Sequence, residues 1–262
     1  MPILKKDSSH IGAQASFNLL TSDGIEISAS HIKRGFESLI VVCPGFFNSR
    51  KDRWIGRAAG IAASRHDVIV FDFRGHGESK GKFLWSAKEH LDVLAVLHYA
   101  QSKGYKAIGI LAFSLGAAAS INAAARCRIV KSMVLISAPC SFWKIDYHFW
   151  EPEMLLDLKG NIDCGWEGKG ANIGNILLDK PEPLREIKKI KNSAIFFIHG
   201  SSDWVIKDYH SRMLYNAADV KQKRIKIIKN GLHAERLIEK NTVLMNDLIL
   251  GWFDETLTKK GE

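Results

Sequence analysis

Short apolar runs recur along the chain, and stretches with an apolar residue at every third or fourth position separate them. The runs cover residues 39–43, 68–71, 106–112, 132–137 and 194–198, and in a further stretch, 223–229, isoleucine alternates with arginine and lysine. Their length and β-branched content predict strands, and the periodic stretches predict helices over residues 51–64, 86–103, 115–126, 207–217 and 239–256. Strands that alternate with helices predict a mainly parallel sheet joined by right-handed crossovers.

The start of the chain has a different pattern. Residues 15–20 and 25–32 alternate apolar and polar side chains, and Ser22, Asp23 and Gly24 separate the two stretches. This pattern predicts an antiparallel hairpin. The chain is therefore expected to form an α/β protein with eight strands in one sheet and helices on both faces.

Ser114 ends the most informative apolar run. Small residues stand two positions before it (Ala112) and two after it (Gly116), and an alanine-rich helical stretch follows. A serine between a strand and a helix needs such small neighbours, because the turn is very tight. The turn would leave the N–H of Leu115 at a helix N-terminus, where a developing oxyanion is stabilised. The alternative is an ordinary serine in a strand-to-helix turn.

A nucleophilic serine also needs a base, and the base needs an acid that orients it. Asp203 follows the strand predicted at 194–198, and His233 follows the strand at 223–229 and an Asn-Gly turn. Both therefore fall at the carboxyl ends of strands, the edge where open α/β sheets place their sites. Ser114, Asp203 and His233 are the expected catalytic residues.

Other residues compete for the same roles. His76 lies in a loop on the correct edge, and His210 lies in a predicted helix where a packing or surface role is the default. Asp146 follows the sixth strand and is the rival acid, whereas Asp208 lies further into a helical stretch.

Four motifs in this order resemble the α/β-hydrolase fold family over nearly the whole chain. Pro44-Gly45-Phe46-Phe47 resembles the oxyanion loop, with proline in place of histidine, and the stretch 72–79 matches the loop after the fourth strand. Residues 199–203 and 231–233 resemble the acid and histidine loops, and Ala112 replaces the first glycine around the serine. The resemblance implies that the backbone N–H groups of Phe46 and Leu115 hold the oxyanion, with Phe47 as the alternative to Phe46.

The resemblance also implies one domain over residues 1–262, with a short cap inserted after strand 6 at about 139–191. No clear strand appears there, and aromatic residues cluster at 142–150. These rings would either line an acyl or alcohol site or pack the cap onto the body. A glycine-rich stretch at 165–174 lacks the Gly-Lys-Ser/Thr ending of a phosphate loop, which argues against nucleotide binding.

The implied activity is hydrolysis of carboxylic esters of small to medium acyl groups through an acyl-enzyme, with no cofactor or metal. A thioesterase would use the same residues. So would a serine aminopeptidase, in which Glu151, Glu153 or Asp157 would hold the substrate ammonium. The alternative outside the enzymes is a catalytically silent hydrolase-fold protein that acts as a binding module.

Composition and charge narrow the range of partners. The 262 residues are 46% hydrophobic, which suits one sizeable core, and the formal net charge is +9. The basic runs at 188–191 and 221–229 lack the interleaved aromatic residues that single-strand binding uses. A solvated basic rim and a small-molecule acyl substrate are therefore expected, rather than a nucleic-acid partner. No sequence pattern indicates the oligomeric state.

Three further features of the sequence predict a cytoplasmic location. The first residues lack the apolar core of a signal peptide. The uncharged stretch 107–125 contains glycine, serine and asparagine, which fits a buried strand and helix better than a membrane span. The four cysteines show no paired spacing, so free thiols in the cytoplasm and no zinc site are expected, with a Cys140–Cys164 disulfide as the alternative.

Overall fold

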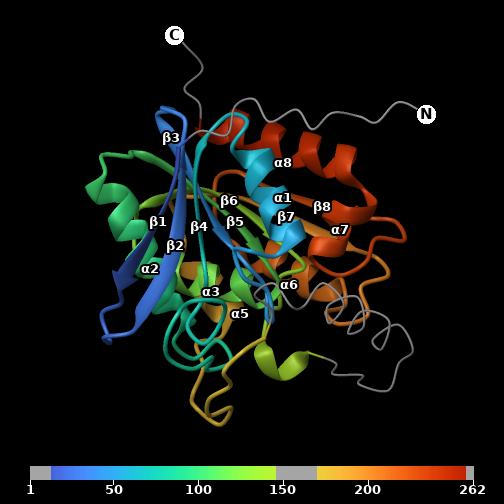
Figure 1. Cartoon of the computed structure of the whole chain (residues 1–262). Coiled ribbons are helices and arrows are strands. Elements are labelled where there is room, and N and C mark those ends of the chain that lie inside the picture. Colours follow the sequence, from blue (N-terminus) through green and yellow to red (C-terminus); the bar gives the residue numbers. More distant parts are fainter. Residues whose placement is uncertain (1–12, 146–169, 258–262) are drawn as a thin grey trace, which may run out of the picture.

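The computed structural model describes residues 13–145 and 170–257, and its eight strands form one sheet (Figure 1). The strands are β1 (Ala13–Leu20), β2 (Glu26–Lys33), β3 (Ser38–Cys43), β4 (Asp67–Phe71), β5 (Ala107–Phe113), β6 (Val130–Ile136), β7 (Ala194–Gly200) and β8 (Lys223–Ile228). Their spatial order is β1-β2-β4-β3-β5-β6-β7-β8. The β1–β2 and β2–β4 pairs are antiparallel and all other pairs are parallel. The predicted fold class is confirmed.

Helices cover both faces of the sheet. One face carries α1 (Arg53–Ala62), α7 (Glu235–Lys240) and α8 (Thr242–Leu257), and the other carries α2 (Glu89–Ser102), α3 (Ser114–Ala124) and α6 (Tyr209–Ala217). Short helical turns follow at η1 (Phe142–Lys144), α5 (Pro183–Glu186) and η2 (Ile187–Lys189).

The central strands are buried on both sides. In β3, Leu39 and Val41 face the α2 and α3 side, whereas Ile40 and Val42 face the α1 and α8 side. A strand covered on both faces needs apolar residues at every position, not at alternate ones. This is why the sequence shows continuous apolar runs there.

The C-terminal helical prediction was wrong in one respect, because residues 239–256 do not form a single helix. Helix α7 begins earlier, at Glu235, and ends at Lys240; α8 begins at Thr242. Asn241 between them leaves the helical region of the backbone, with φ −130° and ψ 40°. Asparagine is a poor residue for a helix interior because its side chain competes for backbone hydrogen bonds.

The loops that follow the parallel strands gather at one edge of the sheet, which is the lower edge in Figure 1. There the loop after β4 meets the segment that starts at residue 170. The Asn172 N–H donates to the Gly75 carbonyl at 2.7 Å, and the Gly174 N–H donates to the Phe83 carbonyl at 2.8 Å. Residues 146–169 of the expected cap lie outside the described residues, so the cap remains a prediction.

Arg74 anchors the loop after β4 in the protein interior. Its guanidinium is 1% exposed and binds Asp92 of α2 at 2.7 Å and Asp23 of the β1–β2 turn at 2.8 Å. The Arg74 N–H also donates to Asp92, at 2.9 Å. One buried cation therefore joins a turn, a loop and a helix.

The stretch 107–125 forms β5 and α3, as the interruptions in its sequence predicted. Across residues 13–145 and 170–257, no helix has the length and apolar character that a bilayer crossing requires. Cys43, Cys127 and Cys140 are free thiols, and Cys164 lies outside the described residues.

We expect Arg74→Met to lower the free energy of unfolding by about 3–5 kcal/mol, because it leaves the fully buried Asp92 carboxylate without its cation. The measurement is equilibrium unfolding in urea. Arg65→Met is the matched control: Arg65 pairs with Asp254 but its side chain is 57% exposed, and its loss should cost less than about 1 kcal/mol. Equal losses in the two variants would contradict the structural role assigned to Arg74.

Candidate active site

Ser114 stands at the junction of β5 and α3 in a strained conformation. Its φ of 51° lies in the left-handed region, which a residue other than glycine rarely adopts. A Cβ atom at position 116 would lie 2.0 Å from the Pro44 carbonyl oxygen, so only glycine fits there. Ala112 is fully buried in the core, which accommodates the methyl group in place of the first motif glycine.

The structure brings together the three residues expected from the sequence. The Nε2 atom of His233 lies 3.0 Å from the Ser114 Oγ. Its Nδ1 atom lies 2.8 Å from Oδ2 and 3.0 Å from Oδ1 of Asp203. Because a carboxylate only accepts, Nδ1 carries the proton and donates it to Asp203. The Nε2 lone pair is then directed at the Ser114 hydroxyl.

Asp203 is held as a buried anion. The N–H groups of Val205 and Ile206 donate to its Oδ1 at 3.1 and 2.9 Å. Burial by itself raises the pKa of the Asp203 carboxyl, but the neighbouring charge of His233 and hydrogen bonds from His199 and His233 outweigh it. The net effect holds this pKa well below its usual range, so the group is ionised at neutral pH.

His199 supports Asp203, whereas the sequence indicated only that it belongs to the loop that carries this acid. It is fully buried, and its Nε2 lies 2.6 Å from the Ile206 carbonyl and 3.2 Å from Asp203 Oδ2. Its Nδ1 lies 2.6 Å from the Ser211 Oγ. Nε2 therefore carries the proton and Nδ1 accepts from the serine hydroxyl. No spacing rule predicts this contact, because Ser211 belongs to α6.

The loop after β3 lies directly against Ser114. A Cβ atom on Gly45 would lie 3.3 Å from the Ser114 Cβ, so this loop packs closely on the serine. Phe47 has a positive φ of 66°, and its N–H donates to the His76 Nε2 at 3.3 Å. The Phe47 amide is thus already bonded, whereas the Phe46 N–H has no acceptor within residues 13–145 and 170–257.

The loop after β4 also holds the far end of this segment. The Arg50 N–H donates to Asp72 Oδ1 at 2.7 Å, and the Arg50 guanidinium pairs with both Asp72 and Glu78. Burial is the largest influence on Asp72 and raises the pKa of its carboxyl, while hydrogen bonds from the Arg50 and Glu78 N–H groups act against it. The loop after β4 therefore contacts the loop after β3 at two places.

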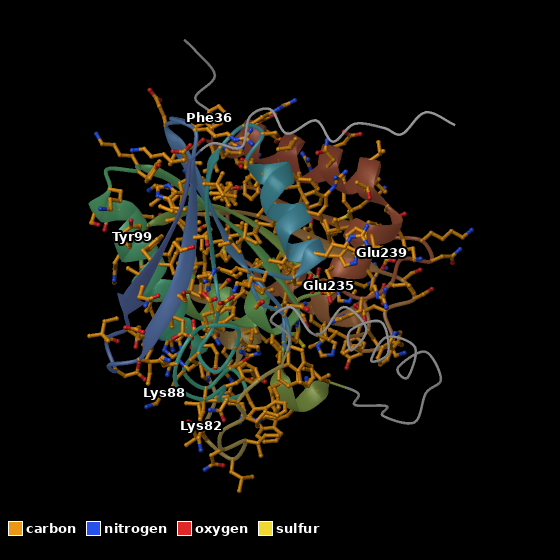
Figure 2. All side chains as sticks on the ribbon, viewed as in Figure 1. Phe36, Lys82, Lys88, Tyr99, Glu235 and Glu239 are labelled. Carbon is orange, nitrogen blue, oxygen red and sulfur yellow. The ribbon has the colours of Figure 1, made fainter. Side chains whose placement is uncertain are left out.

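Glu235 is a buried carboxyl group close to His233 that no motif indicates. It is 7% exposed and begins α7, and Figure 2 labels it together with Glu239, which lies further along the same helix. Burial raises the pKa of the Glu235 carboxyl, while the charge of His233 and a hydrogen bond from Asn48 act in the opposite direction. Asn48 belongs to the loop after β3, so this contact joins that loop to the histidine loop.

The competing residues have other partners. His76 contacts Phe47 rather than Ser114. His210 is buried, with Nδ1 3.1 Å from the Cys140 Sγ and Nε2 3.1 Å from the Lys144 carbonyl. Asp208 binds Arg212 at 2.9 Å. Asp146 and the acids at 151, 153 and 157 lie outside the described residues.

An apolar cluster adjoins Ser114 at the edge of the sheet. Its buried members are Phe83, Leu115, Phe142, Ile145 and Ile206, with Phe46 and Trp85 packed against them. The rings of Phe46 and Phe83 stack with centroids 4.9 Å apart, and Lys82, next to Phe83, is labelled at the lower edge in Figure 2. Phe142 was among the aromatic residues singled out in the sequence, whereas Phe83 and Trp85 were not.

Comparisons with known proteins agree with this architecture. A family model described as alpha/beta hydrolase fold matches residues 38–162. The esterase Pf2001 of Pyrococcus furiosus is similar in structure, with a TM-score of 0.76 and 20% sequence identity over 94% of each chain. The chain has the α/β-hydrolase fold.

Two further structures share this fold at low identity. The hypothetical protein PA2218 of Pseudomonas aeruginosa has a TM-score of 0.76 and 20% identity over 95% of each chain. XC6422 of Xanthomonas campestris, described as a serine hydrolase without lid, has a TM-score of 0.64 and 15% identity, covering 94% of this chain and 96% of its own. Among curated proteins, none matches the sequence of this α/β-hydrolase-fold protein.

We expect Gly116→Ala to lower the free energy of unfolding by about 3 kcal/mol, because the new methyl group would meet the Pro44 carbonyl oxygen. Gly56→Ala is the matched control, since Gly56 also lies in a helix but has open space around its Cβ position. The free energy of unfolding of that variant should rise by about 0.4–1 kcal/mol. If denaturation curves place both variants at wild-type stability or above, the close approach at Gly116 is not as described.

Proposed function

We propose that this protein is a serine hydrolase that cleaves carboxylic esters through an acyl-enzyme. The observation that carries the proposal is the continuous chain of hydrogen bonds from Ser114 through His233 to Asp203. In this proposal the chain is one domain with a cap at about 139–191, and its substrate is a small acyl compound. Support for ester chemistry comes from the apolar cluster beside Ser114 and from a structural neighbour described as an esterase.

The first half of the reaction forms the acyl-enzyme. His233 Nε2 accepts the Ser114 hydroxyl proton while Oγ attacks the acyl carbonyl carbon, and Asp203 stabilises the resulting imidazolium. The carbonyl oxygen becomes an oxyanion. When the tetrahedral intermediate collapses, the bond to the alcohol oxygen breaks and His233 donates its proton to the leaving alkoxide.

The second half releases the acid. His233 takes a proton from water, the hydroxide attacks the acyl carbon, and Ser114 Oγ leaves and regains its proton from His233. The pKa of Asp203 lies well below its usual range, so its carboxylate stays ionised as the pH falls toward 5.

The N–H groups of Leu115 and Phe46 are the proposed donors to the oxyanion. Leu115 is the second residue of α3, and the first N–H groups of a helix have no acceptor within it. Phe46 belongs to the loop packed on Ser114, and the next amide, that of Phe47, is bonded to His76. Loss of one such donor typically raises the barrier by about 2.7–4 kcal/mol.

We expect a fluorophosphonate probe to label the wild-type protein on Ser114 and to leave Ser114→Ala unlabelled, because only an activated serine attacks phosphorus. The readout is in-gel fluorescence, with the labelled peptide identified by mass spectrometry. Ser102→Ala, at an exposed serine on α2, should label like the wild type. An unlabelled wild-type protein would point instead to a silent binding module.

We expect Asp203→Asn to lower kcat for a p-nitrophenyl ester by about 10⁴-fold, because an amide cannot hold the imidazole in the tautomer that receives the serine proton. Asp208→Asn is the control, because the Asp208 carboxylate binds the exposed Arg212 guanidinium rather than a histidine. A loss below about tenfold in Asp203→Asn would argue that His233 does not act as the base.

The preferred acyl chain length can be measured with p-nitrophenyl esters whose chains run from acetyl to about twelve carbons. We expect the highest kcat/KM for small to medium chains, the acyl size that the family resemblance implies, and the apolar cluster beside Ser114 would contact the acyl group. Aminoacyl anilides and acyl thioesters serve as competing substrates. Equal or faster turnover of either would replace the ester as the proposed substrate.

A further inference from the structure

His76 is buried between the loop after β3 and the aromatic rings that adjoin the site. It is 2% exposed and makes edge-to-face contacts with Phe83 and Phe46, with the ring centroids 4.9 and 6.0 Å apart. The ring makes two polar contacts: Nδ1 with the Arg74 carbonyl at 3.1 Å and Nε2 with the Phe47 N–H at 3.3 Å. His76 takes no part in the steps proposed above.

The two partners determine where the His76 proton lies. A carbonyl oxygen only accepts hydrogen bonds, so Nδ1 must carry the proton that faces Arg74. The Phe47 N–H only donates, so Nε2 must present its lone pair. Burial lowers the pKa of the His76 imidazole to about 4, which keeps the ring neutral at physiological pH. His76 is therefore suited to be a permanent acceptor rather than a base.

The backbone that His76 holds is strained. Phe47 has a φ of 66°, and side chains other than glycine lose roughly 1–2 kcal/mol in that region. Such a conformation persists only where surrounding contacts determine it. Two contacts hold Phe47 in this conformation. The Phe47 N–H donates to His76, and the Phe47 carbonyl accepts from the Gly170 N–H at 3.4 Å.

The same contact constrains Phe46. The peptide plane between Phe46 and Phe47 is held by His76, and Gly45 is packed against Ser114 on the other side. The N–H of Phe46 lies between these two anchors. The Phe46 N–H lies in the adjoining peptide plane, between Gly45 and Phe46. Without the His76 contact, Phe47 can relax to a negative φ, and the Phe46–Phe47 plane that fixes Phe46 from its C-terminal side loses a support.

We propose that His76 is a positioning residue, which keeps the Phe46 N–H directed at the oxyanion by accepting the Phe47 N–H. This inference rests on the proposed function and deepens it, since it assigns a role to the loop after β4. It also explains why Phe46, and not Phe47, serves as the donor from this loop.

Three substitutions at position 76 distinguish the effect of the hydrogen-bond acceptor from the effect of the ring's volume. His76→Phe keeps an aromatic ring against Phe46 and Phe83 but has no acceptor. His76→Gln places a carbonyl oxygen near the position of Nε2, and His76→Asn keeps a donor toward Arg74 but is too short to reach Phe47. The Asn and Gln pair tests the proposal even if the His76→Phe protein does not fold.

We expect His76→Phe and His76→Asn to lower kcat by about ten- to a hundredfold with KM within about twofold of wild type, because the contact matters most when the oxyanion forms. His76→Gln should recover most of kcat. His66→Gln is the control, because His66 is a fully buried histidine before β4, bonded to Ser38 Oγ at 2.7 Å, at the opposite edge of the sheet. It should leave kcat unchanged.

Amide hydrogen exchange gives a readout that does not depend on turnover. Peptides that contain Phe47 should exchange faster in His76→Phe and His76→Asn than in wild type and His76→Gln. Unchanged exchange, an equal loss of kcat in the Gln and Asn variants, or a change in KM alone would each overturn the proposal. If wild type and Ser114→Ala have equal activity, the proposed function fails instead, and that failure is recognised without any His76 variant.

Discussion

The close approach of two backbones at Gly116 and Pro44 is the constraint on which the site depends. The 2.0 Å separation that a Cβ at position 116 would have from the Pro44 carbonyl leaves no room for a side chain. This contact sets the loop after β3 against the start of α3, and Ser114 takes its positive φ at the same junction. The serine hydroxyl and the neighbouring amides are thus placed by backbone geometry.

Several buried charges around this junction have partners, and these contacts link separate loops. Asp203 receives bonds from the backbone of its own loop and from two histidines. Asp72 binds Arg50, and Arg74 binds Asp92 and Asp23. A buried ion pair contributes little net stability, but breaking one is costly. These contacts therefore fix the relative positions of loops rather than add greatly to the free energy of unfolding.

Much of this arrangement could be predicted from local patterns. Continuous apolar runs predicted the buried parallel strands, because such strands are covered on both faces. Small residues around Ser114 predicted the tight turn, and the ends of two later strands predicted Asp203 and His233 within reach of it. The division of the last helical stretch at Asn241 was missed, because hydrophobic periodicity continues across the break. The contacts of His199 with Ser211 and of Glu235 with Asn48 were also missed, since each joins distant segments without a spacing signature.

The sequence alone thus indicated the order of the candidate residues along the chain: a serine, an acid and a histidine, each in the turn or loop that follows a predicted strand. It could do so because strand ends and tight turns have local requirements on residue size and polarity. Only the tertiary structure decided that His76 faces Phe47 rather than Ser114, and that Phe83 and Trp85 join Phe142 beside Leu115. Those partners come from different loops. Which loops are neighbours depends on the order of the strands in the sheet, because each loop follows the carboxyl end of its strand.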